Sequence, residues 1–348
     1  MSHLTYPEAG VVGLIQGITE LFPVSSLGHA ILIPAIVGGQ WAQDLSVSAP
    51  GSPYLAFIVG LHVATAAAMI LYFWRDWLRI IRAFFASVRH ALAPEPGTRR
   101  FMPQDTDQTL AWMLILGTIP VGLVGVALQH VFQTHLSKPT LVAVFLFLNG
   151  FVLLAGERAR RRHADMEAQE VAADMQTVSE RQRATVAAGG GGAGGRHSAG
   201  QRAMKQQSAD LAVESDRRIV GRVGWLGAFG LGASQILALL PGISRDGTVM
   251  VCGMFRGLSR QDAARFSFLL SAPVILAAGV LKLPDLTGHM GDGIRGPVLF
   301  GSVLSFIGAY VSLKFLVRYF SDTKRTLTPF AIYCLAAGLG CFIYLSVR

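Results

Sequence analysis

The residues best suited to chemistry lie in residues 16–29, which read Gln-Gly-Ile-Thr-Glu-Leu-Phe-Pro-Val-Ser-Ser-Leu-Gly-His. An ionised group at bilayer depth costs about 2.5–3.5 kcal/mol on insertion scales, so Glu20 in these apolar surroundings indicates a function. His29 lies one helical turn after Ser26, where an imidazole can take the proton of a serine hydroxyl and activate a nucleophile. The alternative is structural: a serine caps the helix that follows Pro23, and His29 hydrogen-bonds a neighbouring carbonyl group.

The same stretch carries groups that suit a phosphate or a metal ion. Ser25 and Ser26 begin a half-helix, whose free N–H groups and positive dipole end favour a phosphate. If the preceding segment is helical, Gln16 and Glu20 lie on one face, four residues apart. Their oxygen atoms are hard ligands suited to Mg²⁺ or Ca²⁺. The alternative for this pair is a hydrogen-bonded polar contact between helices.

A second polar motif, Pro-Gly-Ile-Ser-Arg-Asp-Gly-Thr, occupies residues 241–248. Ser244 is another candidate N-cap, and the planar guanidinium of Arg245 suits phosphate oxygens and the charge that develops in phosphoryl transfer. Two glycines let the backbone approach a ligand closely: Gly242 and Gly247. The alternatives for Arg245 are a structural ion pair with Asp246 or Glu20, or anchoring at the cytoplasmic surface.

The composition indicates the setting in which these groups must be held. The chain is 52% hydrophobic and 15% charged, and several uncharged runs reach the roughly 20 residues that span a hydrocarbon core. We therefore predict an all-α polytopic membrane protein. The net charge of +9 comes from basic residues in the loops between apolar runs, so we predict no nucleic-acid partner. The three cysteines lie in apolar runs without metal-type spacing and are interpreted as packing residues.

Each polar motif interrupts an apolar, glycine-rich segment, which is typical of a re-entrant hairpin whose tip lines a cavity. A first repeat, residues 1–156, and a second repeat, residues 223–348, each contain a hairpin followed by three spans. The hairpins are predicted at residues 9–37 and 223–256. The spans are predicted at residues 53–74, 109–128, 140–156, 263–281, 297–317 and 327–347.

Three spans per half is an odd number, so the second half must enter the membrane with opposite polarity. We therefore predict an inverted-topology repeat whose hairpin tips can meet near the midplane, with the arginine-rich segments inside and both termini outside. Residues 157–222 are predicted to form a flexible linker with no catalytic role. Residues 75–90 mix arginines with aromatic residues, as in an amphipathic helix on the cytoplasmic surface. His62, alone in the first long span, is interpreted as an interior histidine with satisfied hydrogen bonds rather than a catalytic base.

The two motifs resemble the signatures of one protein family. Residues 16–29 resemble the first signature of the bacterial undecaprenyl pyrophosphate phosphatase family, a Glu/Gln-x-x-x-Glu motif that continues into Pro-Val-Ser-Ser-x-Gly-His. Residues 241–248 resemble its second signature, Pro-Gly-x-Ser-Arg-Ser-Gly, and residues 266–273 resemble the pattern that follows it. The resemblance covers nearly the whole chain apart from the linker.

The resemblance implies a multi-pass hydrolase of the bacterial plasma (inner) membrane with its active site facing the outside. Members of the family remove the terminal phosphate from undecaprenyl pyrophosphate, which recycles the lipid carrier for cell-wall synthesis. The resemblance also implies a divalent cation, contact with membrane lipid, a link to bacitracin resistance and a tendency to form homodimers.

Carried over to this sequence, the resemblance makes Ser26 the nucleophile and His29 its acid/base partner. Glu20, assisted by Gln16, would handle the metal ion, and Arg245 would complete the catalytic set. The pyrophosphate would be held by residues at the two motifs: Ser25, Gly242, Ser244, Arg245, Gly247 and Thr248.

The sequence departs from the family pattern beside the site. Leu27 stands where the family usually has Thr, and Asp246 replaces a Ser and is expected to place negative charge near an anionic substrate. The rival interpretation is a transporter or flippase for a lipid carrier or a small anion, because inverted repeats with broken helices are transporter architecture. A transporter needs no nucleophile, so the spacing of Ser26 and His29 favours the enzyme.

Overall fold

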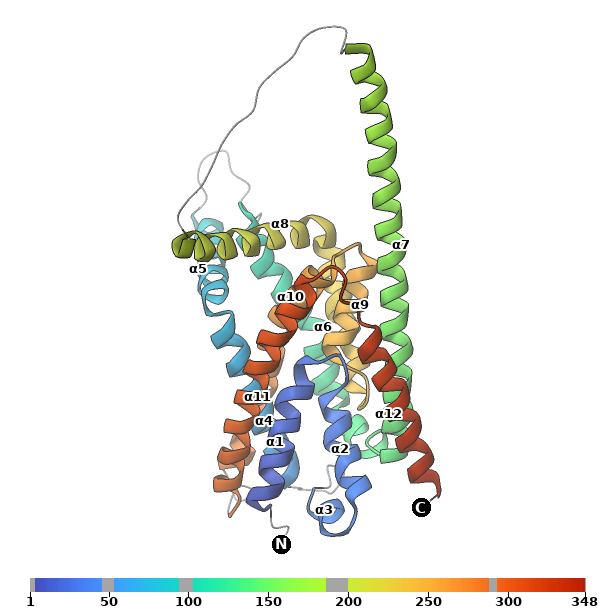
Figure 1. Ribbon diagram of the computed structural model, residues 1–348. Coiled ribbons are helices and arrows are strands. Elements are labelled where there is room, and N and C mark those ends of the chain that lie inside the picture. The colour runs from blue at the N-terminus through green and yellow to red at the C-terminus, as the bar shows by residue number, and fades with distance from the viewer. Residues whose placement is uncertain (1–3, 46–52, 94–102, 186–199, 288–292, 348) are drawn as a thin grey trace.

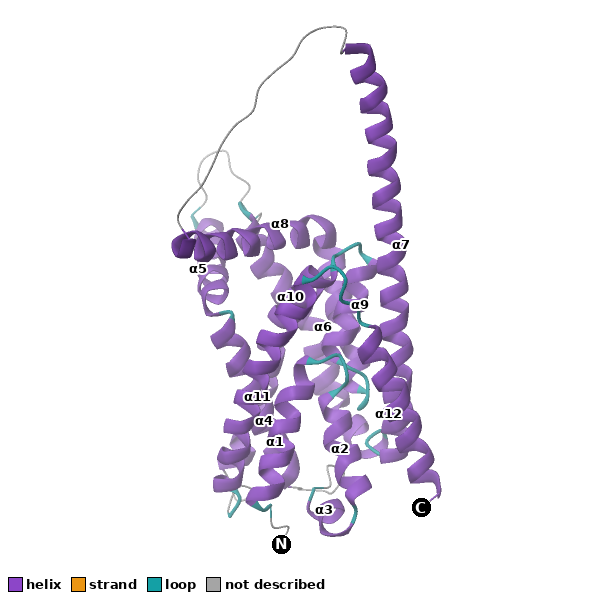
Figure 2. Cartoon of the chain, in the orientation of Figure 1, coloured by secondary structure: helices purple, strands orange, loops and turns teal. Residues whose placement is uncertain are grey.

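The computed structural model describes residues 4–45, 53–93, 103–185, 200–287 and 293–347, and the regular elements in these ranges are all helical (Figure 1, Figure 2). In chain order they are α1 (Tyr6–Leu21), α2 (Ser26–Val37), α3 (Gly39–Asp44), α4 (Pro53–Tyr72), α5 (Trp74–Leu92), α6 (Thr106–His135), α7 (Pro139–Thr185), α8 (Gly200–Ser234), the 3₁₀ helix η1 (Gln235–Leu239), α9 (Arg245–Phe255), α10 (Arg260–Thr287), α11 (Arg295–Ser321) and α12 (Thr328–Val347). The prediction of an all-helical chain is confirmed.

The six predicted spans coincide with six long helices, α4, α6, α7, α10, α11 and α12. Within the described ranges, five of them, all except α4, are long and apolar enough to cross a membrane on their own. The sixth, α4, passes the same test when it is taken together with its bent continuation, α5. Length and hydropathy therefore agree with the predicted polytopic membrane protein.

Two broken segments enter the bundle from opposite ends and meet in its middle (Figure 1, Figure 2). The first is α1 and α2, interrupted at Pro23, and the second is the end of α8 with η1 and α9, interrupted at Pro241. α1 begins at a capping box in which Thr5 and Glu8 bond each other's backbone N–H groups. α8 changes direction at Gly224, where φ is 61°. Both breaks lie at the predicted positions.

The first helix of each hairpin packs on a long helix from the other half of the chain. α1 lies against α11, and the last part of α8 lies against α6. A Cβ atom at Gly17 would lie 2.2 Å from the carbonyl oxygen of Ser305, and one at Gly232 would lie 2.0 Å from that of Gly117. Glycine at both contacts lets the helix backbones touch, as is common between helices in membranes. The two halves therefore interlock.

The amphipathic helix predicted at residues 75–90 is present as α5, which lies at 85° to the Phe57–Tyr72 part of α4. It lies at the end of the bundle away from both termini, where the first part of α8 crosses the helix ends (Figure 1). Ile80 of α5 is buried against the bundle, whereas Phe85 is 65% exposed. α5 therefore presents an apolar surface that the described protein does not cover.

The linker predicted at residues 157–222 is too long at both ends. α7 continues from its apolar part to Thr185 and extends well beyond the bundle (Figure 1), and α8 begins at Gly200. Glu157 and Asp216, inside the predicted linker, are 2% and 0% exposed. Each forms an ion pair with an arginine of α10, Arg260 or Arg265. These ion pairs with α10 thus hold both ends of the expected linker against the helix bundle.

An ion-pair cluster joins α5, α6, α8 and α10 at the end of the bundle away from the termini. Asp216 accepts hydrogen bonds from Arg79 and, at 2.9 and 3.1 Å, from Arg265. Arg265 also donates to Asp76 at 2.9 Å, and Arg79 donates to Asp107. Each arginine is thus shared between carboxylates of different helices, so the buried charges compensate one another.

Asp216→Ala is expected to destabilise the protein by roughly 3–5 kcal/mol, because it leaves Arg79 and Arg265 partly buried without their shared partner. The midpoint of thermal unfolding in detergent should fall by several degrees. Glu214→Ala is the matched control on the same helix, since Glu214 is 54% exposed and its contacts with arginines are 3.8 Å long. Equal midpoints for the two variants would contradict a structural role for the cluster.

Candidate active site

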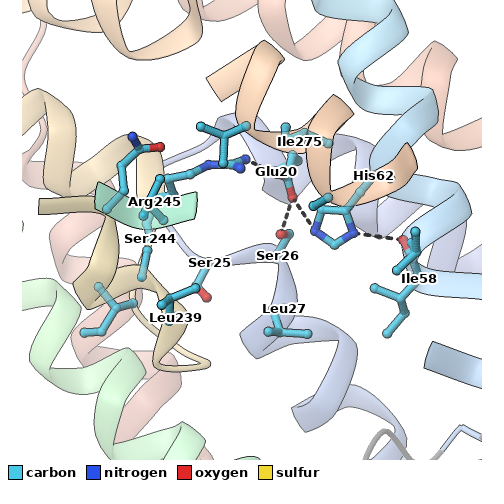
Figure 3. Close-up of a pocket in the computed structure, with 18 residues that line it drawn as sticks. Glu20, Ser25, Ser26, Leu27, Ile58, His62, Leu239, Ser244, Arg245 and Ile275 are labelled. Carbon is cyan, nitrogen blue, oxygen red and sulfur yellow. Dashed lines mark hydrogen bonds and ion pairs between the residues drawn. The ribbon is translucent and has the colours of Figure 1, made fainter. Parts of the chain in front are cut away.

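A cavity of about 280 Å³ lies between the hairpin tips, α4 and α10 (Figure 3). Its wall is mostly apolar, and its polar side chains gather around the tips of the two hairpins and on α4. The polar lining residues are Glu20, Ser25, Ser26, His62, Gln235, Ser244 and Arg245. The structure therefore brings the first polar motif next to the second, as predicted from the two hairpins.

Glu20 is the centre of a hydrogen-bond network. Its carboxylate accepts hydrogen bonds from Gln16 Nε2 at 2.7 Å, from the Ser26 hydroxyl and from the Arg245 guanidinium. It also lies 3.3 Å from Nε2 of His62 (Figure 3). An isolated carboxylate is costly in such a buried place, and cationic neighbours compensate its charge. The predicted alternative of an ion pair between Arg245 and Glu20 is the geometry present.

Ser25 fixes the start of α2 and joins the two hairpin tips. Its φ of 68° is a strained value for a residue with a side chain. Its hydroxyl accepts hydrogen bonds from the N–H of Gly28 at 3.2 Å and from the N–H of Gly242 at 3.1 Å. Gly242 has a φ of 113°, and a Cβ atom there would lie 2.5 Å from the carbonyl oxygen of Val142. Ser25 is thus the N-cap of α2, and it holds the positive end of this helix at the cavity.

Asn149 of α7 connects the two helix breaks, and sequence reasoning missed it. Its Nδ2 donates to the Pro23 carbonyl oxygen at 2.9 Å, and its Oδ1 accepts from the N–H of Ser244 at 3.0 Å. The side chain is fully buried. Broken helices leave backbone groups without intrahelical partners, and buried groups need partners. The available signal was a single amide in the middle of the span predicted at residues 140–156.

Ser244 and Arg245 begin α9 at the cavity. The Ser244 hydroxyl accepts from the N–H of Gly247 at 3.1 Å, so the predicted N-cap is present. Within the described chain, Nε of Arg245 and Oε1 of Gln235 are buried without a hydrogen-bond partner. An N–H donor without a partner at a helix N-terminus suits an anionic oxygen. Arg245 and the N-terminus of α9 therefore provide donor groups at this end of the cavity.

The described structure shows no hydrogen bond between the side chains of His29 and Ser26. Its Nδ1 lies 2.7 Å from the carbonyl oxygen of Ser25, and its Nε2 lies 2.7 Å from the hydroxyl of Tyr333 on α12. Because Nδ1 must carry the proton shared with the carbonyl oxygen, Nε2 is free to accept from Tyr333. The structural alternative for His29 is thus the observed geometry. The spacing argument could not include this partner on the last helix.

His62 lines the cavity, and both of its ring nitrogens have partners, as expected of a satisfied interior histidine, but its contact with Glu20 was not predicted. Its Nδ1 lies 2.8 Å from the carbonyl oxygen of Ile58, and its Nε2 faces the Glu20 carboxylate (Figure 3). Both partners are acceptors, so the geometry favours an imidazolium or a proton shared with Glu20. The sequence did contain a sign that His62 belongs to the site, because it is an ionisable residue inside an apolar span, as Glu20 is.

Gln16 and Glu20 lie on one face of α1 as predicted, but their side-chain oxygen atoms do not point together at a position where a metal ion could bind. Gln16 directs its amide nitrogen to the carboxylate, and its Oε1 is buried without a partner. The described residues contain no group of three or more His, Cys, Asp or Glu side chains that could hold a metal ion. In this arrangement the residues do not fit a divalent cation, although the orphaned oxygen of Gln16 is a ligand type that such an ion prefers.

The first turn of α9 behind the cavity contains three residues that were expected near the substrate. Gly247 and Thr248 do not line the cavity, and the Thr248 hydroxyl donates to a carbonyl oxygen of its own turn at 2.8 Å. Asp246 accepts hydrogen bonds from Ser267 and Ser271 of α10 at 2.8 and 2.5 Å. The serines of α10 thus hold the Asp246 carboxylate outside the cavity lining, while the expectation that it places negative charge near the substrate stays a prediction.

Comparison with known proteins agrees with the two motifs. The profile of a family described as "Bacitracin resistance protein BacA" matches residues 9–186 and 199–340. A protein from Mycolicibacterium paratuberculosis named undecaprenyl-diphosphatase is 52% identical, and the match covers 100% of this chain and 99% of that relative. A protein from Frankia alni named undecaprenyl-diphosphatase 2 is 48% identical, with 100% of both chains covered. The similarity thus extends over every helix at the cavity, and the chain belongs to the BacA bacitracin resistance protein family.

Proposed function

We propose that this protein hydrolyses undecaprenyl pyrophosphate to undecaprenyl phosphate and inorganic phosphate, which returns the lipid carrier to cell-wall synthesis. One observation carries the proposal: a serine hydroxyl and a guanidinium, from two different hairpins, converge on the carboxylate of Glu20 in one cavity (Figure 3). The name of the similar proteins, undecaprenyl-diphosphatase, supports the same reaction.

The pyrophosphate group is proposed to bind between the N-termini of α2 and α9, whose dipoles favour an anion. Ser25 and Ser244 hold these termini in place as N-caps. Arg245 would exchange Glu20 for phosphate oxygens, and its unpartnered Nε provides a further donor. The prenyl chain would lie against the apolar wall, which includes Ile58 of α4 and Ile275 of α10.

Ser26 is proposed as the nucleophile and Glu20 as the acceptor of its proton. The Ser26 Oγ would bond to the terminal phosphorus while the bond from that phosphorus to the bridging oxygen breaks, and undecaprenyl phosphate leaves. Glu20 would give this proton to the departing phosphate oxygen and so become a carboxylate again. Water would then attack the phosphoserine with Glu20 as base, and Glu20 would return the proton from water to the Ser26 oxygen as inorganic phosphate is released. Because substrate draws Arg245 away from the carboxylate, Glu20 becomes a stronger base when substrate is bound. His29 as acid/base partner stays a prediction, and its contacts favour a role in holding Ser25.

We also infer that the two halves form an inverted-topology repeat in the bacterial plasma membrane, with the active site serving the outer face. The reciprocal packing of α1 on α11 and α8 on α6 supports the repeat. Both termini lie at one end of the bundle, and the arginine-rich α5 lies at the other end (Figure 1). By the positive-inside rule the end with α5 faces the cytoplasm, which supports termini on the outside. The homodimer stays a prediction.

Cysteine labelling tests this orientation in a background without Cys252, Cys334 and Cys341. Arg162→Cys, at an exposed position of α7, is expected to resist an impermeant maleimide in intact cells and to react after permeabilisation. Ala42→Cys, at an exposed position of α3 near the opposite end, should react in intact cells. The reverse pattern would contradict the orientation.

Phosphate release separates the hydrolase from a transporter or flippase built on the same architecture. Purified protein in detergent is expected to release inorganic phosphate from undecaprenyl pyrophosphate, whereas folded protein without release would contradict the hydrolase. Treatment with EDTA, followed by Mg²⁺ or Ca²⁺, tests the predicted cation. Loss and recovery of the rate would support the cation, and an unchanged rate would show that the side chains act without it.

Substitutions at Ser26, Glu20 and His29 distinguish the two candidate proton acceptors. Ser26→Ala and Glu20→Gln are each expected to lower kcat by at least about 10²-fold, because both groups act mainly in the transition state. The double variant Ser26→Ala/Glu20→Gln should have a kcat only slightly below that of either single variant, since the two residues act as a unit. His29→Gln should lose less, and its loss should add to that of Ser26→Ala.

Thermal unfolding midpoints serve as the control that each of these variants is folded. The opposite result would assign the acid/base role to His29. In that case the decreases in kcat would be additive when Glu20→Gln is combined with Ser26→Ala, and non-additive when His29→Gln is combined with Ser26→Ala. A rate near that of the wild type for Ser26→Ala would rule out the serine nucleophile and favour direct attack by water.

A further inference from the structure

Three arginines of α5 form a row that no acidic side chain of the described protein neutralises. Arg75, Arg82 and Arg89 are exposed, and within the described ranges their side chains make no ion pair or hydrogen bond. Residues seven apart on a helix differ by only about 20° in direction. Arg75 also lies over the Trp74 ring, 5.2 Å from its centroid, and such a contact leaves its charge unneutralised. One face of α5 therefore carries three cations without an anionic partner in the described ranges.

A row of exposed apolar side chains lies beside the arginine row. Its members are Trp74, Leu78, Ile81, Phe85 and Leu92, which are between 42% and 75% exposed. This row is offset from the arginines by one residue, which corresponds to about 100° around an α-helix. α5 thus has the two adjacent surfaces, one apolar and one basic, of a helix that lies in a membrane interface.

A groove of about 720 Å³ lies between the arginine row and the start of α6. Arg75, Arg79 and Arg82 line it, together with Asp105 and Asp107. Both carboxylates are already engaged, because Asp107 pairs with Arg79 and Asp105 accepts a backbone N–H at the start of α6 at 2.8 Å. Arg75 and Arg82 are therefore the cations of the groove that remain available to an anion.

The position of α5 fits a membrane surface rather than open solvent. α4 is part of the membrane-crossing bundle, and α5 turns from it by 85°. α5 lies at the end of the bundle where the ion-pair cluster fixes it through Arg79 to α8 (Figure 1). A helix at this angle to a membrane-spanning helix runs along the lipid headgroups.

We propose that α5 and this groove form a binding site for the headgroup of an anionic phospholipid. The phosphate group binds Arg75 and Arg82, and the apolar row enters the acyl region of the same leaflet. Guanidinium forks match phosphate oxygens, and each arginine near a membrane surface strengthens the attraction to anionic lipid by roughly fivefold. A nucleic acid would use the same cations, but it would leave the apolar row exposed to water.

The experiment measures which lipids the full-length protein keeps. The protein is reconstituted in bilayers of equal parts phosphatidylglycerol and phosphatidylcholine, purified in mild detergent, and its bound lipids are counted by mass spectrometry. The wild type is expected to retain phosphatidylglycerol in preference. The triple variant Arg75→Gln/Arg82→Gln/Arg89→Gln should lower the ratio of the two lipids by at least roughly fivefold. Its rate of hydrolysis should not change, because these residues lie outside the cavity.

A second triple variant controls for charge alone. Arg217→Gln/Arg318→Gln/Lys324→Gln removes three exposed cations from α8, α11 and the loop before α12, at the same end of the bundle, and should leave the lipid ratio unchanged. An equal loss in both triple variants, or no loss in the α5 variant, would overturn the proposal. If the α5 triple variant does not fold, Arg82→Glu provides the test, and a wild-type lipid ratio in that variant would overturn the proposal.

Discussion

The fold depends on how two broken helices satisfy their backbone groups away from water. A break leaves N–H and carbonyl groups without intrahelical partners, and such groups cannot face lipid. Asn149 bonds the Pro23 carbonyl of one break and the Ser244 N–H of the other, while Ser25 accepts the N–H of Gly242. Because the N–H groups of Gly242 and Ser244 bond to side chains of the first half, the second hairpin has these backbone groups satisfied only when it is docked on the first half. The cavity follows from this pairing, since it lies between the paired tips.

The same pairing places the reacting groups with little freedom. Ser25 is held at a positive φ by contacts of its hydroxyl and carbonyl groups with Gly28, Gly242 and His29, and such strain persists only where the surroundings determine it. The next residue, Ser26, begins α2 with its hydroxyl already on Glu20. Preorganisation of this kind lowers the reorganisation needed during proton transfer.

The spans and the hairpins could be predicted from the sequence because each depends on local residues. An apolar run of sufficient length indicates a span, and a proline with polar neighbours indicates a break. The same local reasoning predicted Ser244 as an N-cap and limited the N-cap of α2 to Ser25 or Ser26, of which the structure shows Ser25. Contacts between distant segments could not be predicted, so the positions of His62 and Asn149 in the site were missed. The spacing of His29 allowed two geometries, and the sequence could not predict that its imidazole would lie between the Ser25 carbonyl and Tyr333 on the last helix.

The buried charges at the cavity are better explained by function than by stability. Glu20 and Arg245 expose only 3% and 18% of their side chains, and the desolvation of such a pair commonly exceeds the attraction that it gains. A packed apolar pair would hold the hairpins together at least as well. An anionic substrate changes this balance, because its phosphate oxygens can replace the carboxylate as the partner of Arg245. The ion pair therefore keeps the arginine and the carboxylate in place at the cavity until phosphate separates them, and the released carboxylate is then next to the hydroxyl that must lose its proton.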